Sequence, residues 1–73
     1  MDWRTEDYRD HTIFVTLHES RGNQNRWMGS FVISKDGENI DRASVANTYE
    51  SEDEARQNVF RLGKMRVDEL LDK

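Results

Sequence analysis

The stretch Ser51-Glu52-Asp53-Glu54-Ala55 decides the fold, because it begins the one long helix that the sequence predicts. Ser51 and Glu54 have the spacing of a capping box. In this motif the serine side chain accepts a hydrogen bond from the amide of the third helical residue, and the glutamate reaches back to the amide of the capping residue. Acidic side chains in the first turn also interact favourably with the helix dipole. We therefore expect a helix that begins at Ser51.

The apolar residues after this cap predict which side of the helix is buried. At about 100° per residue they fall within one half of a helical wheel, whereas Met65 lies on the polar side. They are Ala55, Val59, Phe60, Leu62, Gly63, Val67, Leu70 and Leu71. Gly63 leaves two alternatives open, because a glycine directly after a helix would end it at Leu62. The unbroken phase of the apolar stripe favours one helix that continues to Leu71.

Three strands are expected before the helix, over His11–Glu19, Arg26–Lys35 and Asn39–Asn47. They are rich in β-branched and aromatic residues, and the apolar residues of the first two alternate. Asp36-Gly37 predicts a type I′ hairpin turn, since such a turn needs positive φ at both central residues. The alternation in the third strand breaks between Ile40 and Ala43, which predicts a bulge or a later start of that strand.

The predicted fold class is therefore α+β, a three-stranded antiparallel meander sheet with one C-terminal helix on one face (β-β-β-α). Residues 1–73 form a single domain. Residues 1–10 leave two alternatives, a frayed terminus or a segment whose Trp3 or Tyr8 covers an apolar face of the sheet. A chain of this size buries only about 60% of the surface of its unfolded form, and self-association is one way to enlarge so thin a core.

Composition argues against several chemistries. The chain has no cysteine, so we expect no disulfide, no thiolate nucleophile and no zinc site built on sulfur. The formal net charge is −4 and no segment is basic, which counts against a general nucleic-acid binder. The start of the chain lacks an apolar run, so we expect neither a signal peptide nor a membrane span, and a cytoplasmic location.

Catalytic and metal-binding patterns are also weak. His11 and His18 are seven positions apart, so on a regular strand they point to opposite faces and cannot easily share a metal. No serine lies in a nucleophile-elbow sequence. The acidic residues around Gly37 do not follow the calcium-loop pattern. We predict a non-enzymatic protein with no catalytic residue, no cofactor and no metal.

A second apolar face of the sheet is the strongest hint of function. If the helix covers the side of Ile13, then Phe14, Met28 and Val32 point the other way, where a sheet with one solvated face is normally polar. These three residues are either covered by the N-terminal aromatics, or tolerated in solvent, or used to bind a partner. The last alternative predicts a protein-interaction or self-associating module, most simply a homodimer.

A nucleic-acid-binding module is the alternative function, and it would use the sheet face and the Arg21–Trp27 loop. The candidate contacts are Arg21, Asn23, Gln24, Arg26, Lys35 and Arg42. Arg, Asn and Gln are side chains that read base edges and phosphates. The competing interpretation is a polar turn that leads into a core tryptophan, so a nucleic-acid partner is less favoured than a protein partner.

Two segments carry a resemblance to known families. Trp27-Met28-Gly29-Ser30-Phe31, a hairpin and then Thr48–Arg56 resemble small β-β-β-α modules such as the plant-type AP2 DNA-binding domain. The same order is similar to bacterial domains of unknown function whose helix starts in this way after a sheet. The resemblance spans about residues 26–60 and implies the topology. AP2 domains bind DNA through an Arg-rich sheet, and Thr12–Leu17 stands where their Arg-dense first strand would be, so DNA binding is not carried over.

Overall fold

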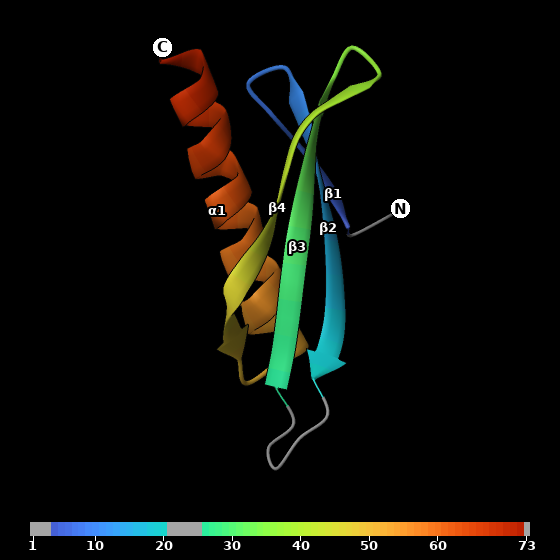
Figure 1. The fold of residues 1–73 in the computed structure, drawn as a ribbon, viewed down its shortest axis with the longest axis vertical. Helices are drawn as coiled ribbons and strands as arrows, with labels where there is room; N and C mark the ends of the chain where they lie inside the picture. Colours follow the sequence, from blue (N-terminus) through green and yellow to red (C-terminus); the bar gives the residue numbers. More distant parts are fainter. Residues whose placement is uncertain (1–3, 21–25, 73) are drawn as a thin grey trace.

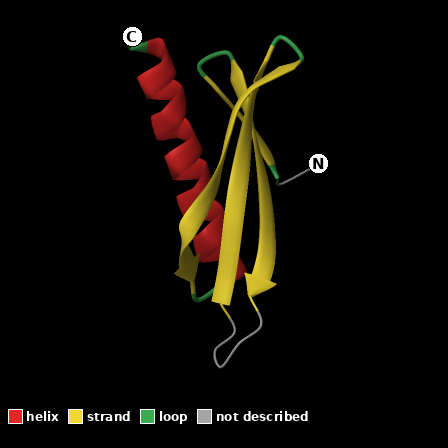
Figure 2. Cartoon of the chain, viewed as in Figure 1, coloured by secondary structure: helices red, strands yellow, loops and turns green. Residues whose placement is uncertain are grey.

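The computed structural model describes residues 4–20 and 26–72 as a four-stranded antiparallel sheet with one helix along one face (Figures 1 and 2). The elements are β1 (Thr5–Tyr8), β2 (His11–Ser20), β3 (Arg26–Lys35), β4 (Glu38–Tyr49) and α1 (Glu52–Leu71). Each strand pairs with the next in sequence, which makes the sheet a meander. The α+β class and the C-terminal helix are confirmed, but the sheet has four strands rather than the three that the sequence predicted.

The additional strand is β1, in a segment that is too polar to show an apolar alternation. Thr5–Tyr8 pairs antiparallel with β2 through a hairpin turn in which Arg9 and Asp10 have φ of 50° and 67°. Asp tolerates this left-handed region, whereas Arg rarely adopts it. A frayed terminus is therefore wrong for residues 5–8, and Trp3 lies outside the described residues.

The turn between β3 and β4 has the predicted geometry. Asp36 and Gly37 both have positive φ, 53° and 83°, and Lys35 pairs with Glu38 on either side of them. These angles confirm the hairpin that the Asp-Gly pair predicted. β4 continues to Tyr49, two residues beyond the expected end of the strand.

The expected break in the alternation of β4 is a bulge at Ile40. Asp41 lies opposite Ile33, but Asn39 lies opposite Ser34, so Ile40 is one extra residue on β4. An extra residue shifts every following side chain to the other face. The bulge explains why Ile40 and the apolar residues after it have different parity.

The hydrophobic core lies between α1 and the face of the sheet formed mainly by β2 and β3. The buried members are Ile13, Val15, Phe31, Ile33, Val45, Tyr49, Ala55, Val59, Phe60 and Val67. Leu17, Trp27, Leu62, Leu70 and Tyr8 pack against them while partly exposed. Both the sheet face and the helix stripe expected from the sequence are confirmed, except that Leu71, the last residue of α1, is exposed.

The helix starts at the predicted cap and does not stop at the glycine. Ser51 Oγ accepts a hydrogen bond from the Glu54 amide at 3.1 Å, and α1 continues through Gly63 to Leu71. A Cβ on Gly63 would lie only 2.8 Å from Ile13 Cγ2 on β2. This glycine therefore allows close contact between the helix and the sheet, and it does not act as a C-terminal cap.

Candidate functional site

The side of the sheet opposite α1 is the candidate site, and we call it the open face. It consists of the side chains of β1 to β4 that point away from α1. Phe14 lies in it directly opposite Val32 and is 42% exposed, and Met28 and Val32 are half-buried. Among residues 4–20 and 26–72, no helix or strand covers this face, because α1 lies on the other side of the sheet (Figure 1). The structure thus places all three predicted residues on one face, with Phe14 beside Val32 and with Met28 four residues from Val32 along β3.

Strand register places Phe14 and Val32 in a row that crosses the whole sheet. Thr5 lies opposite Phe14 on β1, and Arg42 lies opposite Val32 on β4. The neighbouring row consists of Thr16, Ser30 and Ser44. These side chains are small and carry hydroxyl groups, so the Phe14 ring is the bulkiest apolar group at the centre of the open face.

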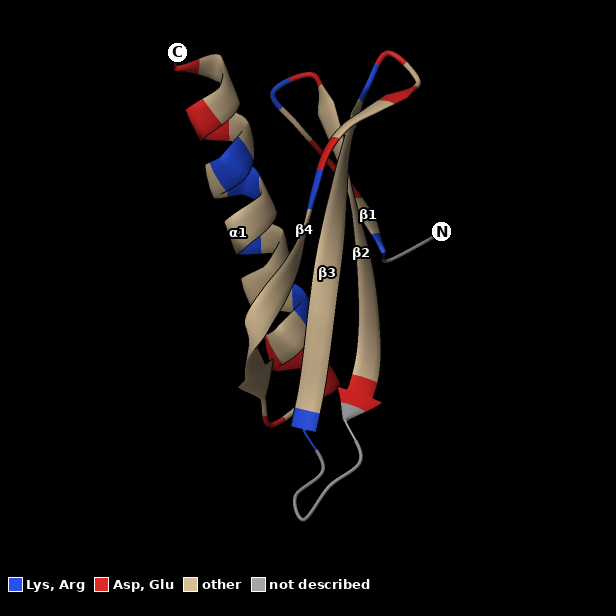
Figure 3. Ribbon diagram, viewed as in Figure 1, with Lys and Arg blue, Asp and Glu red and all other residues tan. Residues whose placement is uncertain are grey.

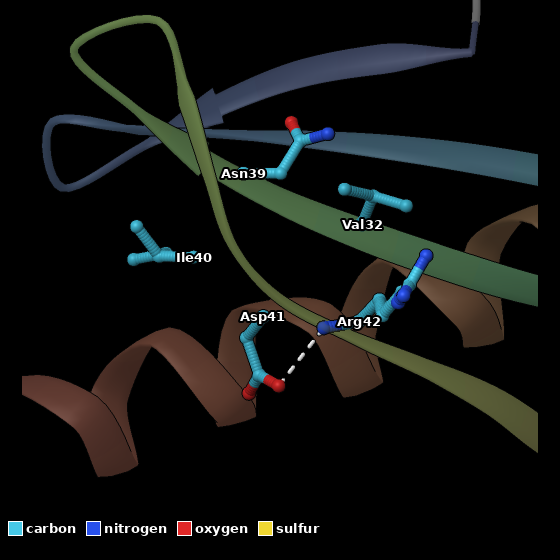
Figure 4. A pocket seen from close by; sticks show the side chains of 5 residues that line it. All are labelled: Val32, Asn39, Ile40, Asp41 and Arg42. Atoms are coloured by element: carbon cyan, nitrogen blue, oxygen red, sulfur yellow. Dashed lines mark hydrogen bonds between the residues drawn. The ribbon is translucent and has the colours of Figure 1, made fainter.

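An open hollow lies beside Val32, close to the bulge in β4. Its lining residues are Val32, Asn39, Ile40, Asp41 and Arg42. Figure 4 shows Val32, Asn39 and Arg42 pointing to the same side of the sheet, while Asp41 points toward the helix. Asp41 Oδ2 accepts a hydrogen bond there from Arg66 Nε on α1. The cation of the hollow, Arg42, is therefore presented to solvent, and its carboxylate is held by the helix.

Charge is unevenly distributed over the strands. Figure 3 shows that the middle of β2 and β3 has no charged residues. The charged residues lie mainly on α1 and toward the strand ends. Among the described residues, three charged ones lie on the open face by strand register: Asp7 on β1, Arg42 on β4 and Arg26 at the start of β3. Asp7 and Arg42 lie at opposite edges of the sheet and are exposed, and Asp7 Oδ1 accepts a hydrogen bond from Thr12 Oγ1 at 2.9 Å. The centre of the open face is thus uncharged, with an anion at one edge strand and a cation at the other.

Tyr8 lies on the helix side of the sheet and does not cover Phe14. Its hydroxyl donates to both carboxylate oxygens of Asp68 on α1, at 3.0 and 3.1 Å, and Arg9 Nη1 donates to Asp68 Oδ1 at 2.6 Å. The bond from Arg9, with a further one from Tyr8, lowers the pKa of Asp68, and the bond to Asp68 raises the pKa of Tyr8. Coverage of the open face by Tyr8 is therefore wrong, because this residue instead fastens β1 to α1.

The two histidines point to opposite faces, as their spacing predicted. His11 is buried on the helix side, with Nδ1 2.8 Å from the carbonyl oxygen of Arg9. His18 is exposed on the open face, opposite Met28. Within the described ranges, no group of three His, Cys, Asp or Glu side chains is arranged to hold a metal ion.

The candidate nucleic-acid contacts do not gather in one place in the described part of the chain. Arg26 Nε donates to Thr48 Oγ1 at 2.7 Å, and Arg26 Nη2 donates to the Thr48 carbonyl at 3.0 Å. Lys35 lies at the other end of β3, roughly 30 Å away at about 3.3 Å per residue. Arg42 lies between them on β4. The remaining candidates, Arg21, Asn23 and Gln24, lie outside the described residues.

Asp7 is the residue of the site that the sequence did not reveal. It reaches the open face only because β1 pairs with β2, and β1 was not predicted. The available signal was Asp10, a residue type that tolerates positive φ, directly before the strand that starts at His11. A turn at that position would have implied a strand on its N-terminal side.

No protein-family model matches this sequence, and comparisons with curated proteins and with solved structures also give no match. Within the residues that the structure describes, no helix is both long and apolar enough to cross a membrane.

Proposed function

We propose that this protein is a small non-enzymatic interaction module that binds another protein through its open face. The observation that carries the proposal is the exposed Phe14 ring, paired with Val32 at the centre of the open face. Aromatic side chains supply much of the binding energy of protein interfaces, and they act near the centre of the contact. A solvated sheet face would ordinarily be polar at such a position.

The distribution of polar groups supports a protein partner. Interface centres are depleted of charged residues, whereas their rims are polar and solvent-accessible. The open face has this arrangement, with an uncharged centre and with Asp7 and Arg42 at its edges. In the described part of the chain, the other exposed large apolar residues are Ile40 at the bulge and Met65 and Leu71 on the helix. Single exposed residues of that kind are normal on protein surfaces.

The hollow beside Val32 suits side-chain binding better than catalysis. Its carboxylate, Asp41, is paired with Arg66, and its other lining side chains are Arg42, an amide and two aliphatic groups. General acid–base catalysis requires a titratable group within reach of a substrate proton. A carboxylate held by an arginine of the helix is poorly placed for that task.

Photocrosslinking tests the proposal. We would replace Phe14 by benzoylphenylalanine and irradiate the protein in extracts of its source cells, with Gln57, exposed on the outer side of α1, as the matched control position. We expect protein adducts from position 14 that position 57 does not give. Equal adduct patterns from the two positions would refute the proposal. Adducts from position 14 that nuclease removes would instead support the nucleic-acid alternative.

A further inference from the structure

We infer that the partner of the open face is a second copy of this chain, packed face to face about a twofold axis parallel to the strands. This inference depends on the proposed function, because it names the occupant of the same surface. It follows from the order of side chains across the sheet, which is self-complementary in one orientation only.

Only the axis direction decides which strands meet. In two sheets packed face to face, a twofold axis parallel to the strands places β4 of one copy over β1 of the other, and β2 over β3. Phe14 then lies over Val32 of the other copy, and this contact occurs twice. A twofold axis that lies between the two sheets but runs perpendicular to the strands would instead stack β4 on β4 and Phe14 on Phe14. Both orientations join the apolar centres, so apolar contact alone does not choose between them.

Charge at the edges of the open face selects the axis. With the axis parallel to the strands, Arg42 of one copy lies over Thr5 of the other, because these residues end the row that contains Phe14 and Val32. Asp7 is two residues further along β1 on the same face, so it meets Arg42 as an ion pair, twice per dimer. The perpendicular axis would bring the two Arg42 side chains together, and like charges across an interface oppose binding.

The dimensions of packed sheets fit this pairing. Face-to-face sheets lie about 10 Å apart, a gap that an arginine from one sheet and an aspartate from the other can span together. The small side chains of Thr16, Ser30 and Ser44 flank the central row and leave room for the Phe14 ring against the opposite sheet. The dimer therefore buries the exposed apolar centre and neutralises both edge charges at the same time.

Charge-reversal substitutions in the purified protein test the inference. Sedimentation equilibrium over a range of concentrations should show a reversible dimer. Phe14→Glu should abolish it, whereas Met65→Glu, which changes an exposed apolar residue on α1, should leave it unchanged. Asp7→Arg and Arg42→Glu should each raise the dimer dissociation constant at least tenfold. Circular dichroism should show that all variants are folded.

The decisive sample is an equimolar mixture of Asp7→Arg and Arg42→Glu chains. Each variant repels its own copy at both edges, but a mixed dimer has one native ion pair and one reversed pair, so the mixture should dimerise as tightly as the native protein. A native chain that remains monomeric at several hundred micromolar, or a mixture that stays monomeric, would overturn the inference. If adducts to other proteins still formed from position 14, the proposed function would stand. Without such adducts, both would fall.

Discussion

Gly63 on α1 faces Ile13 on β2 so closely that a methyl group on the glycine would lie 2.8 Å from Ile13 Cγ2. Ile13 is fully buried, and its Cγ2 is attached to the branched carbon next to the backbone, so it has little freedom to move away. Gly29 on β3 has the same role beside Val59 of α1, because a Cβ on Gly29 would lie 2.7 Å from Val59 Cγ2. Two glycines thus set the distance between the helix and the sheet.

Gly63→Ala should destabilise the protein, although alanine favours a helix by about 1 kcal/mol over glycine. Overpacking in a well-packed core costs about 1–3 kcal/mol, and we expect a net fall of about 1–2 kcal/mol in the free energy of unfolding. Urea denaturation at one fixed protein concentration measures it. The loss should be smaller in an Ile13→Leu background, because leucine has no Cγ2. An equal loss in both backgrounds, or a gain, would contradict this account of Gly63.

Ser51→Ala should remove the side-chain cap of α1. The hydroxyl that accepts from the Glu54 amide is lost, and such changes cost about 0.5–2 kcal/mol of stability. Ser51→Asn is the matched control, since asparagine caps helices about as well as serine. We expect thermal unfolding to separate the two variants clearly. If Ser51→Asn were as unstable as Ser51→Ala, the cap would not be the cause.

Stability should fall in acid through Asp68. Its pKa is lower in the folded protein than the usual value of about 3.9, because Arg9 and Tyr8 donate to its ionised form. The stability that this difference contributes is fully present above the unfolded pKa and is lost as pH falls below about 4 toward the folded pKa. Tyr8 behaves in the opposite sense: its pKa is raised by the bond to Asp68, so its contribution is lost as pH rises above about 10.

Thermal unfolding midpoints between pH 2 and pH 7 test the role of Asp68. Asp68→Asn should lower the midpoint at pH 7 and flatten its dependence on pH below 4. Glu50→Gln, which changes an exposed carboxylate outside this cluster, should leave the acid dependence close to that of the native protein. If Asp68→Asn lost stability in acid as steeply as the native chain, the ties between β1 and α1 would not explain the acid sensitivity.

Features set by short-range chemistry could be predicted. The Ser51 cap, the Asp36-Gly37 turn and the alternation of β2 and β3 depend on residues within a few positions of one another. Each of them has the geometry that its sequence indicated. The three apolar members of the open face followed from the same alternation, because successive side chains of a strand point to opposite faces.

Features that depend on contacts between distant segments were missed or left open. β1 is polar, and its position is set by pairing with β2 and by the bonds of Tyr8 and Arg9 to Asp68, which lies 60 residues beyond Tyr8. Asp7 therefore joined the open face only in the folded structure, where it lies at the edge strand opposite to that of Arg42.

The cap at Ser51 is thus a local feature that the sequence by itself determined. The sequence did not determine the length of the helix, because a glycine can either end a helix or allow a strand to pack closely against it. Only the tertiary structure decided between them, since the position of Ile13 against Gly63 is fixed by packing across the core. The same packing assigns one face of the sheet to α1 and leaves the face of Phe14 open.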